Sequence, residues 1–103
     1  MSQVDDVLAA LADPMRRRIL DLVAAKGAVS ASVLAAELPV SRQAIVKHLG
    51  VLEKAELVAS ERAGRENNFS VRSGALDATA SWMASLASQW DQRLAAIKKI
   101  AES

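Results

Sequence analysis

The sequence predicts a small, mainly α-helical domain with a single β-hairpin, and three observations support this fold class. Apolar residues recur at spacings of three and four along most of the chain, which is the period of an amphipathic helix. One stretch, over residues 57–72, alternates loosely instead and turns at a glycine, as a hairpin does. Hydrophobic residues make up 51% of the chain but aromatic ones only 3%, so the core must consist of Ala, Leu, Val and Ile. Such a core suits closely packed helices.

Length and composition limit the class of protein. With 103 residues, the chain is long enough for a single compact domain, 1–103, and too short for two. It contains no cysteine, which excludes disulfides and thiolate metal sites, and we expect a cytoplasmic location. No apolar run approaches the length of a membrane span, and the first residues do not resemble a signal peptide. We therefore expect no membrane association.

Charge is distributed unevenly along the chain. The net charge is +1, but residues 14–65 contain nine basic and five acidic residues, a net of +4. Residues 1–13 have a net charge of −3, and residues 66–103 are balanced. A basic middle segment is what a surface facing phosphate groups requires. An excess of four is mild, so it favours a nucleic-acid partner without demanding one.

Two helices are expected at the start of the chain. Asp13-Pro14 should end the first and begin the second, because Asp is a good N-cap and Pro fits the first helical position. The second helix should extend through Ala25 and end at Lys26-Gly27, since Gly suits the left-handed position after a helix and Lys suits the negative end of its dipole. The apolar residues that define these helices are Val4, Val7, Leu8 and Leu11 in the first, and Met15, Ile19, Leu22 and Val23 in the second.

A helix, a tight turn and another helix are expected over residues 30–54. Ala28-Val29 is a short extended piece, after which Ser30 caps a brief helix that Pro39 ends. Ser41 is a good N-cap for the next helix, which should begin at Arg42 and run to Lys54. Its buried side consists of Ile45, Leu49 and Leu52. This arrangement is the helix-turn-helix pattern.

The other side of the helix that begins at Arg42 is polar and basic. A helix that inserts into the DNA major groove needs Arg, Gln and Lys at its exposed start. Taken alone, however, this stretch fits an ordinary amphipathic surface helix at least as well. We expect Gln43 to read a base edge, because a side-chain amide can pair with N6 and N7 of adenine. Arg42 and Lys47 should contact guanine or phosphate. The candidate DNA-binding residues of this helix are Ser41, Arg42, Gln43, Ala44, Val46 and Lys47.

A β-hairpin is expected over residues 57–72, directly after this helix. Strands 57–62 and 67–72 should flank a turn in which Gly64 is free to adopt positive φ. A hairpin in this position is a "wing", and Arg62 and Arg65 lie at its tip. These arginines fit a solvated turn, but their position beside the basic helix favours contacts with phosphate or the minor groove. By contrast, we expect the Arg16-Arg17-Arg18 run to make helix-face salt bridges and one backbone contact rather than to read bases.

The last helix is expected over residues 75–101. At about 25 residues it would be roughly 38 Å long, which is more than the small domain can cover. Packing against a second copy is the simplest way to bury its apolar stripe, so we expect a homodimer with the last helix at its interface. Trp82 and Trp90 could line a ligand cavity instead, although core or interface tryptophans are commoner. The dimer-interface candidates on this helix are Met83, Leu86, Trp90, Leu94 and Ile97.

Catalytic and metal-binding patterns are not found. His48 is the only histidine, and without convergent carboxylates it is a poor zinc ligand, so we expect a structural or phosphate-facing role for it. The chain has no Gly-rich phosphate loop and no carboxylate pair beside a nucleophile. We therefore expect neither an enzyme nor a cofactor.

In these motifs the sequence resembles the ArsR-type (ArsR/SmtB-like) winged helix-turn-helix repressors. The matching segments, in the same order and spacing, are Leu11–Leu20, Ser41–Leu49, Val51–Val58 and Gly64-Arg65. The resemblance implies a homodimer joined by its first helix, residues 1–12, and its last, so the interface candidates of the first helix are Val4, Leu8 and Leu11. It also implies repression of its own gene or a nearby operon until a signal relieves it. The Cys pair of the arsenic-sensing branch is missing, and the last helix lacks the His ligands of the zinc- and nickel-sensing branches. The resemblance therefore implies a member that senses no metal, with an unidentified small-molecule inducer or none.

Together, the residues and the resemblance predict a dimer that binds double-stranded DNA. Its two-fold symmetry predicts an inverted-repeat operator with half-site centres about 10 base pairs, or a multiple of that, apart. The alternative is a dimeric protein-interaction module of the same fold that has no specific DNA binding.

Overall fold

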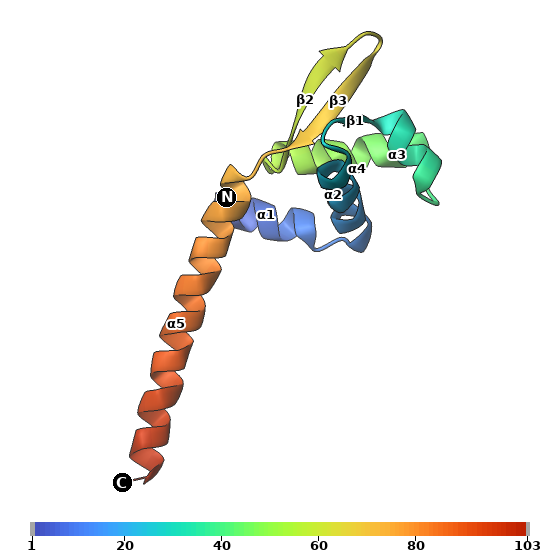
Figure 1. Cartoon of the computed structure of the whole chain (residues 1–103). Coiled ribbons are helices and arrows are strands. Elements are labelled where there is room, and N and C mark those ends of the chain that lie inside the picture. The colour runs from blue at the N-terminus through green and yellow to red at the C-terminus, as the bar shows by residue number, and fades with distance from the viewer. Residues whose placement is uncertain (1, 103) are drawn as a thin grey trace.

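The computed structural model describes residues 2–102, which form five helices and three strands (Figure 1). In chain order the elements are α1 (Gln3–Leu11), α2 (Pro14–Lys26), β1 (Val29–Ser30), α3 (Ala31–Glu37), α4 (Arg42–Lys54), β2 (Val58–Ala63), β3 (Glu66–Val71) and α5 (Gly74–Glu102). Elements α1 to β3 pack together, whereas α5 extends away from them as a long straight rod. The molecule is consequently elongated, with extents of 68 × 25 × 25 Å. No helix within residues 2–102 is long and apolar enough to cross a membrane.

Side-chain caps fix where the first four helices begin, because they satisfy backbone N–H groups that have no partner inside the helix. The caps expected at Asp13, Ser30 and Ser41 are confirmed, and Ser2 caps α1 in the same way. The Ser41 hydroxyl accepts from the backbone N–H of Ala44 at 3.1 Å. Since this contact sets the first turn of α4, it also sets which side chains stand at the exposed end of that helix.

Asp13 is the cap that accepts from two backbone N–H groups, where the serine caps accept from one each. Its Oδ1 accepts from the N–H groups of Met15 at 2.7 Å and Arg16 at 3.2 Å. The Arg16 N–H is the largest influence that lowers the pKa of Asp13 below its usual 3.8, and the charges of Arg16 and His48 act in the same direction. The charged carboxylate therefore stabilises the fold above the unfolded-state pKa, and this stabilisation is lost as the pH falls through the lower folded-state value.

The variant Asp13→Asn keeps a good N-capping side chain but removes the charge. We expect wild type to be more stable than this variant at neutral pH, and we expect the difference to shrink below about pH 4 as Asp13 becomes protonated. Urea denaturation midpoints measured between pH 2.5 and 7 would test this. A difference that stays constant across the whole range would contradict the electrostatic origin of the effect.

Arg16 and Arg17 bind the C-terminal end of α1. Arg16 Nε donates to the carbonyl of Ala10 at 2.6 Å, and Arg17 Nη1 donates to that of Leu11 at 2.5 Å. The salt bridge expected for this run is confirmed between Arg16 and Asp13, at 3.7 Å. These contacts join α1 to α2, so two of the three arginines are occupied by the fold itself.

The sheet has the order β1-β3-β2, and both pairings are antiparallel. Phe69 on β3 lies opposite Val29 on one side and Ser60 on the other. The hairpin is confirmed, but its strands are Val58–Ala63 and Glu66–Val71 rather than 57–62 and 67–72. The turn is therefore tighter than expected, with Gly64 at a φ of +64°. Strand β1 anchors the base of the wing to the helices.

One apolar core joins α1, α2, α3, α4, the sheet and the first turn of α5. Its fully enclosed large side chains are Val7, Ile19, Val23, Leu34, Ile45, Leu49, Leu52, Leu57 and Val58. Three of these lie on α4, more than on any other helix. Helix α4 is thus held rigidly by its inner face, which leaves its outer face available.

Helix α5 has 29 residues, which is longer than the roughly 25 expected. Its start packs against α1, where Ala75 and Thr79 are buried. Beyond Thr79, every described residue of the helix is exposed. Among residues 2–102, no other element covers this part of the helix.

Candidate nucleic-acid interface

Helix α4 has the two faces that its sequence predicts. Ile45, Leu49 and Leu52 are 0% exposed and pack into the core. Gln43, Lys47 and Gly50 are exposed on the other side. Within residues 2–102, the side chains of Gln43 and Lys47 make no hydrogen bond or ion pair, so both remain available to an external partner.

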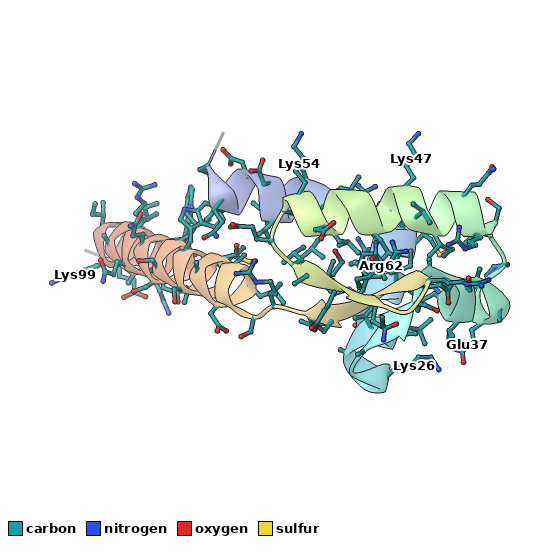
Figure 2. The ribbon with its side chains drawn as sticks, turned by 90° about the horizontal axis from the view of Figure 1, so that it is seen from above. Lys26, Glu37, Lys47, Lys54, Arg62 and Lys99 are labelled. Carbon is teal, nitrogen blue, oxygen red and sulfur yellow. The ribbon has the colours of Figure 1, made fainter. Side chains whose placement is uncertain are left out.

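Lys54 belongs to this outward face, although sequence reasoning did not select it. It is exposed and follows Lys47 by seven residues, close to two full helical turns. Figure 2 shows Lys47 and Lys54 projecting in the same direction from α4, away from the rest of the molecule. The seven-residue spacing could have identified it. The cationic face of α4 therefore extends along the whole helix and is not confined to its start.

Arg42 lies on the side of α4 that faces the wing. Its Nε donates to the Ser32 hydroxyl at 3.0 Å, and its Nη2 lies 3.9 Å from a carboxylate oxygen of Glu66. A recess of about 190 Å³ between α3, α4 and β3 lies beside it. Two other predicted residues flank the outer face: Val46 is 45% exposed on the same recess, and Ala44 is half-buried on the opposite edge. Arg42 is thus already bound within the chain.

Arg62 and Arg65 are both exposed near the tip of the wing. Arg62 Nε donates to the carbonyl of Gly64 at 3.0 Å, so this side chain also stabilises the turn. In Figure 2 Arg62 lies over the hairpin, well separated from Lys47 and Lys54. The predicted cations accordingly form two groups, one on α4 and one on the wing.

His48 is half-buried on the edge of α4 that faces the start of α2, where its charge influences Asp13. The structural or phosphate-facing role expected for it stays a prediction. Among residues 2–102, no three His, Asp, Glu or Cys side chains are arranged to hold a metal ion.

The predicted interface residues of α5 form an exposed apolar stripe. Met83, Leu86, Trp90, Leu94 and Ile97 are 52%, 38%, 52%, 58% and 62% exposed. Trp82 is also exposed, and the Arg93 guanidinium lies 5.1 Å from the centre of the Trp90 ring. The tryptophans are therefore not part of the core of their own chain.

The predicted interface residues of α1 are more mixed. Leu8 is 38% exposed. Val4 is half-buried, and Leu11 packs partly against the core of its own chain. Leu8 is thus the member of this set that is most accessible to a partner.

Comparison with known proteins agrees with this geometry. A family model described as a helix-turn-helix domain matches residues 11–61. The transcriptional repressor SdpR of Bacillus subtilis is 31% identical over 91 residues, which is 88% of this chain and all of SdpR. Among solved structures, an ArsR-like transcriptional regulator from Rhodococcus sp. RHA1 is 46% identical with a TM-score of 0.87, and the match covers 98% of this chain and 94% of that one.

A second solved structure is described as a homodimeric winged helix-turn-helix DNA-binding domain from Mycobacterium bovis, a possible ArsR-family regulator. It is 27% identical with a TM-score of 0.64, and the match covers 89% of this chain and 82% of that one. The helix-turn-helix, the wing and the relatives lead to the same conclusion. The chain belongs to the ArsR family of winged helix-turn-helix transcriptional regulators.

Proposed function

We propose that the protein is a homodimeric repressor that binds an inverted-repeat operator. Each subunit lays α4 in the major groove, where Gln43 reads a base edge and Lys47 and Lys54 contact phosphates. Arg62 and Arg65 bind the flanking backbone or the minor groove. A bound dimer prevents transcription by occluding the promoter.

The observation that carries this proposal is the outward face of α4. Gln43, Lys47 and Lys54 stand exposed on a helix whose inner face is rigidly packed. A helix that recognises bases needs a rigid scaffold, since bidentate contacts to a base require accurate placement of the side chain. The neighbouring wing adds a second cationic group at a fixed position relative to the helix.

The apolar stripe of α5 supports the dimer. Soluble proteins rarely leave so long a row of large apolar side chains in contact with water, and a second copy can cover it symmetrically. The relative from Mycobacterium bovis, described as homodimeric, supports this arrangement. Two copies joined in this way present two α4 helices to one duplex, which explains why an inverted repeat is expected.

Selection of duplexes from a random library tests the proposal. We expect an inverted repeat to be recovered, and we expect affinity for it to fall with salt at a log-log slope of about −0.9 per phosphate contact. Recovery of no preferred sequence would overturn specific repression and leave the protein-interaction module as the explanation. Repeating the binding assay with candidate small molecules tests whether a signal releases the DNA.

The variant Gln43→Ala is expected to relax sequence preference at one position of each half-site, with a loss of about 1–3 kcal/mol in discrimination, because it removes a base contact. Arg65→Ala is the matched comparison, since it removes a cation of the wing and leaves the major-groove face of α4 intact. It should weaken binding to all duplexes similarly and make the salt slope shallower by about 0.9 per subunit. Fluorescence anisotropy on the operator and on single-base variants would measure both effects. Unchanged selectivity in Gln43→Ala would show that another residue reads the base.

A further inference from the structure

A small polar cluster at the start of α4 joins this helix to α3 and β3. Ser32 lies on α3, Arg42 begins α4 and Glu66 begins β3. The Ser32 hydroxyl donates to Glu66 Oε1 at 2.5 Å and accepts from Arg42 Nε at 3.0 Å. Glu66 Oε1 is also 3.9 Å from Arg42 Nη2. The guanidinium is therefore held by two neighbours, Ser32 on α3 and Glu66 on β3.

A free cation at the position of this cluster would have a large effect on DNA binding. An unrestrained arginine at the start of α4 can bind any nearby phosphate, and such contacts carry no sequence information. Arg42 and Glu66 are still 57% and 42% exposed, so the cluster faces the same solvent that a duplex would occupy. The Glu66 carboxylate additionally repels a phosphate that approaches Arg42 closely.

We propose that Glu66 is a specificity-determining positioning residue, which with Ser32 holds Arg42 against the wing and keeps it from binding phosphates of arbitrary sequence. This inference rests on the proposed DNA-binding function. Glu66 acts through Arg42 and does not itself contact DNA. Its role is to lower the affinity of the protein for non-operator DNA. Affinity for the operator falls less, because the restrained position of Arg42 already fits that duplex.

The variant Glu66→Gln removes the charge while keeping a side chain of the same size. We expect its affinity for a scrambled duplex to rise by about two- to fivefold per subunit, the range for an ion pair this exposed. Affinity for the operator should change less, so the ratio of the two should fall. The log-log slope of scrambled-DNA affinity against salt concentration should become steeper by about 0.9 per subunit, because the freed Arg42 then contacts a phosphate.

Glu61→Gln is the matched control. Glu61 is an exposed carboxylate on β2 that makes no hydrogen bond or ion pair within the described chain, so its replacement changes the net charge equally without freeing Arg42. It should raise affinity for operator and scrambled duplex alike and leave their ratio unchanged. Ser32→Ala removes the other restraint at constant charge and should lower the ratio in the same direction as Glu66→Gln.

The background Arg42→Ala completes a double-mutant cycle. In that background Glu66→Gln should no longer alter the ratio of operator to scrambled affinity beyond what Glu61→Gln does. One outcome is that wild type prefers the operator to scrambled DNA, and that Glu66→Gln and Ser32→Ala show the same preference as wild type. In that case this inference is wrong and the proposed function stands. If wild type itself shows no preference for any duplex, the proposed function fails, and this inference with it.

Discussion

Replacing Leu86 and Leu94 together with aspartate is expected to convert the protein to a monomer. Both lie on the exposed apolar stripe of α5, at 38% and 58% exposure. A partner helix that covers this stripe would enclose the new carboxylates without a counter-charge, which is strongly unfavourable. Light scattering after size-exclusion chromatography would measure the mass directly.

The same double variant should lose operator affinity by about 10²- to 10⁴-fold, because the advantage of two linked half-site contacts disappears. Ser88 and Gln92 provide the control, since they are exposed on the opposite side of the same helix. Aspartate at these two positions should leave both mass and affinity close to wild type. A dimeric Leu86/Leu94 variant with normal operator affinity would show that the stripe is not the interface.

The variant Leu49→Ala is expected to destabilise the protein by about 2–5 kcal/mol, the range for truncating an enclosed leucine. Leu49 is 0% exposed on the inner face of α4, so the substitution leaves a cavity directly behind the reading face. A loss of this size is a large part of the stability of a domain this small. Urea denaturation at one fixed protein concentration would measure it, since the stability of a dimer depends on concentration.

Two substitutions help to interpret that loss. Leu49→Met conserves volume and should cost less than about 1.5 kcal/mol. Val51 is 38% exposed on the same helix, so Val51→Ala tests whether truncating any apolar side chain of α4 is equally costly. A loss at Leu49 no greater than that at Val51 would mean that the inner face does not hold the helix.

Local features of the fold were predictable because they depend on neighbours in sequence. The caps at Asp13, Ser30 and Ser41 follow from the hydrogen bonds that such side chains offer at a helix start. The buried stripe of α4 follows from its 3.6-residue period. The hairpin follows from alternation around Gly64, whose φ is +64°.

Features that depend on distant pairing were not predictable. The short extended piece at Ala28-Val29 was expected, but its pairing was not: strand β1 forms where Phe69 lies opposite Val29, forty positions along the chain. The corner after α4 uses Glu56 at a φ of +64°, where a glycine would be the usual signal. Its carboxylate accepts from the Gln3 side chain of α1 at 2.8 Å, a contact between residues 53 positions apart.

In the candidate site, too, local features were predictable from the sequence and contacts between distant residues were not. Exposure of Gln43 and Lys47 follows from the helical wheel, and Lys54 could have been added from its spacing. The restraint on Arg42 could not have been predicted from the sequence, since Ser32 and Glu66 belong to two other elements that only the tertiary fold brings to it. Sequence patterns indicate which face a residue occupies, but not which distant residue binds it there.

The central claim is that two copies join along α5 and present two α4 helices to the same duplex. Sedimentation equilibrium at micromolar protein, with and without the selected operator, tests it most directly. The account predicts a species of twice the 10.9 kDa mass of one chain in the absence of DNA, and two chains per duplex in its presence. A 10.9 kDa species alone, or a single chain bound to each operator, would contradict it.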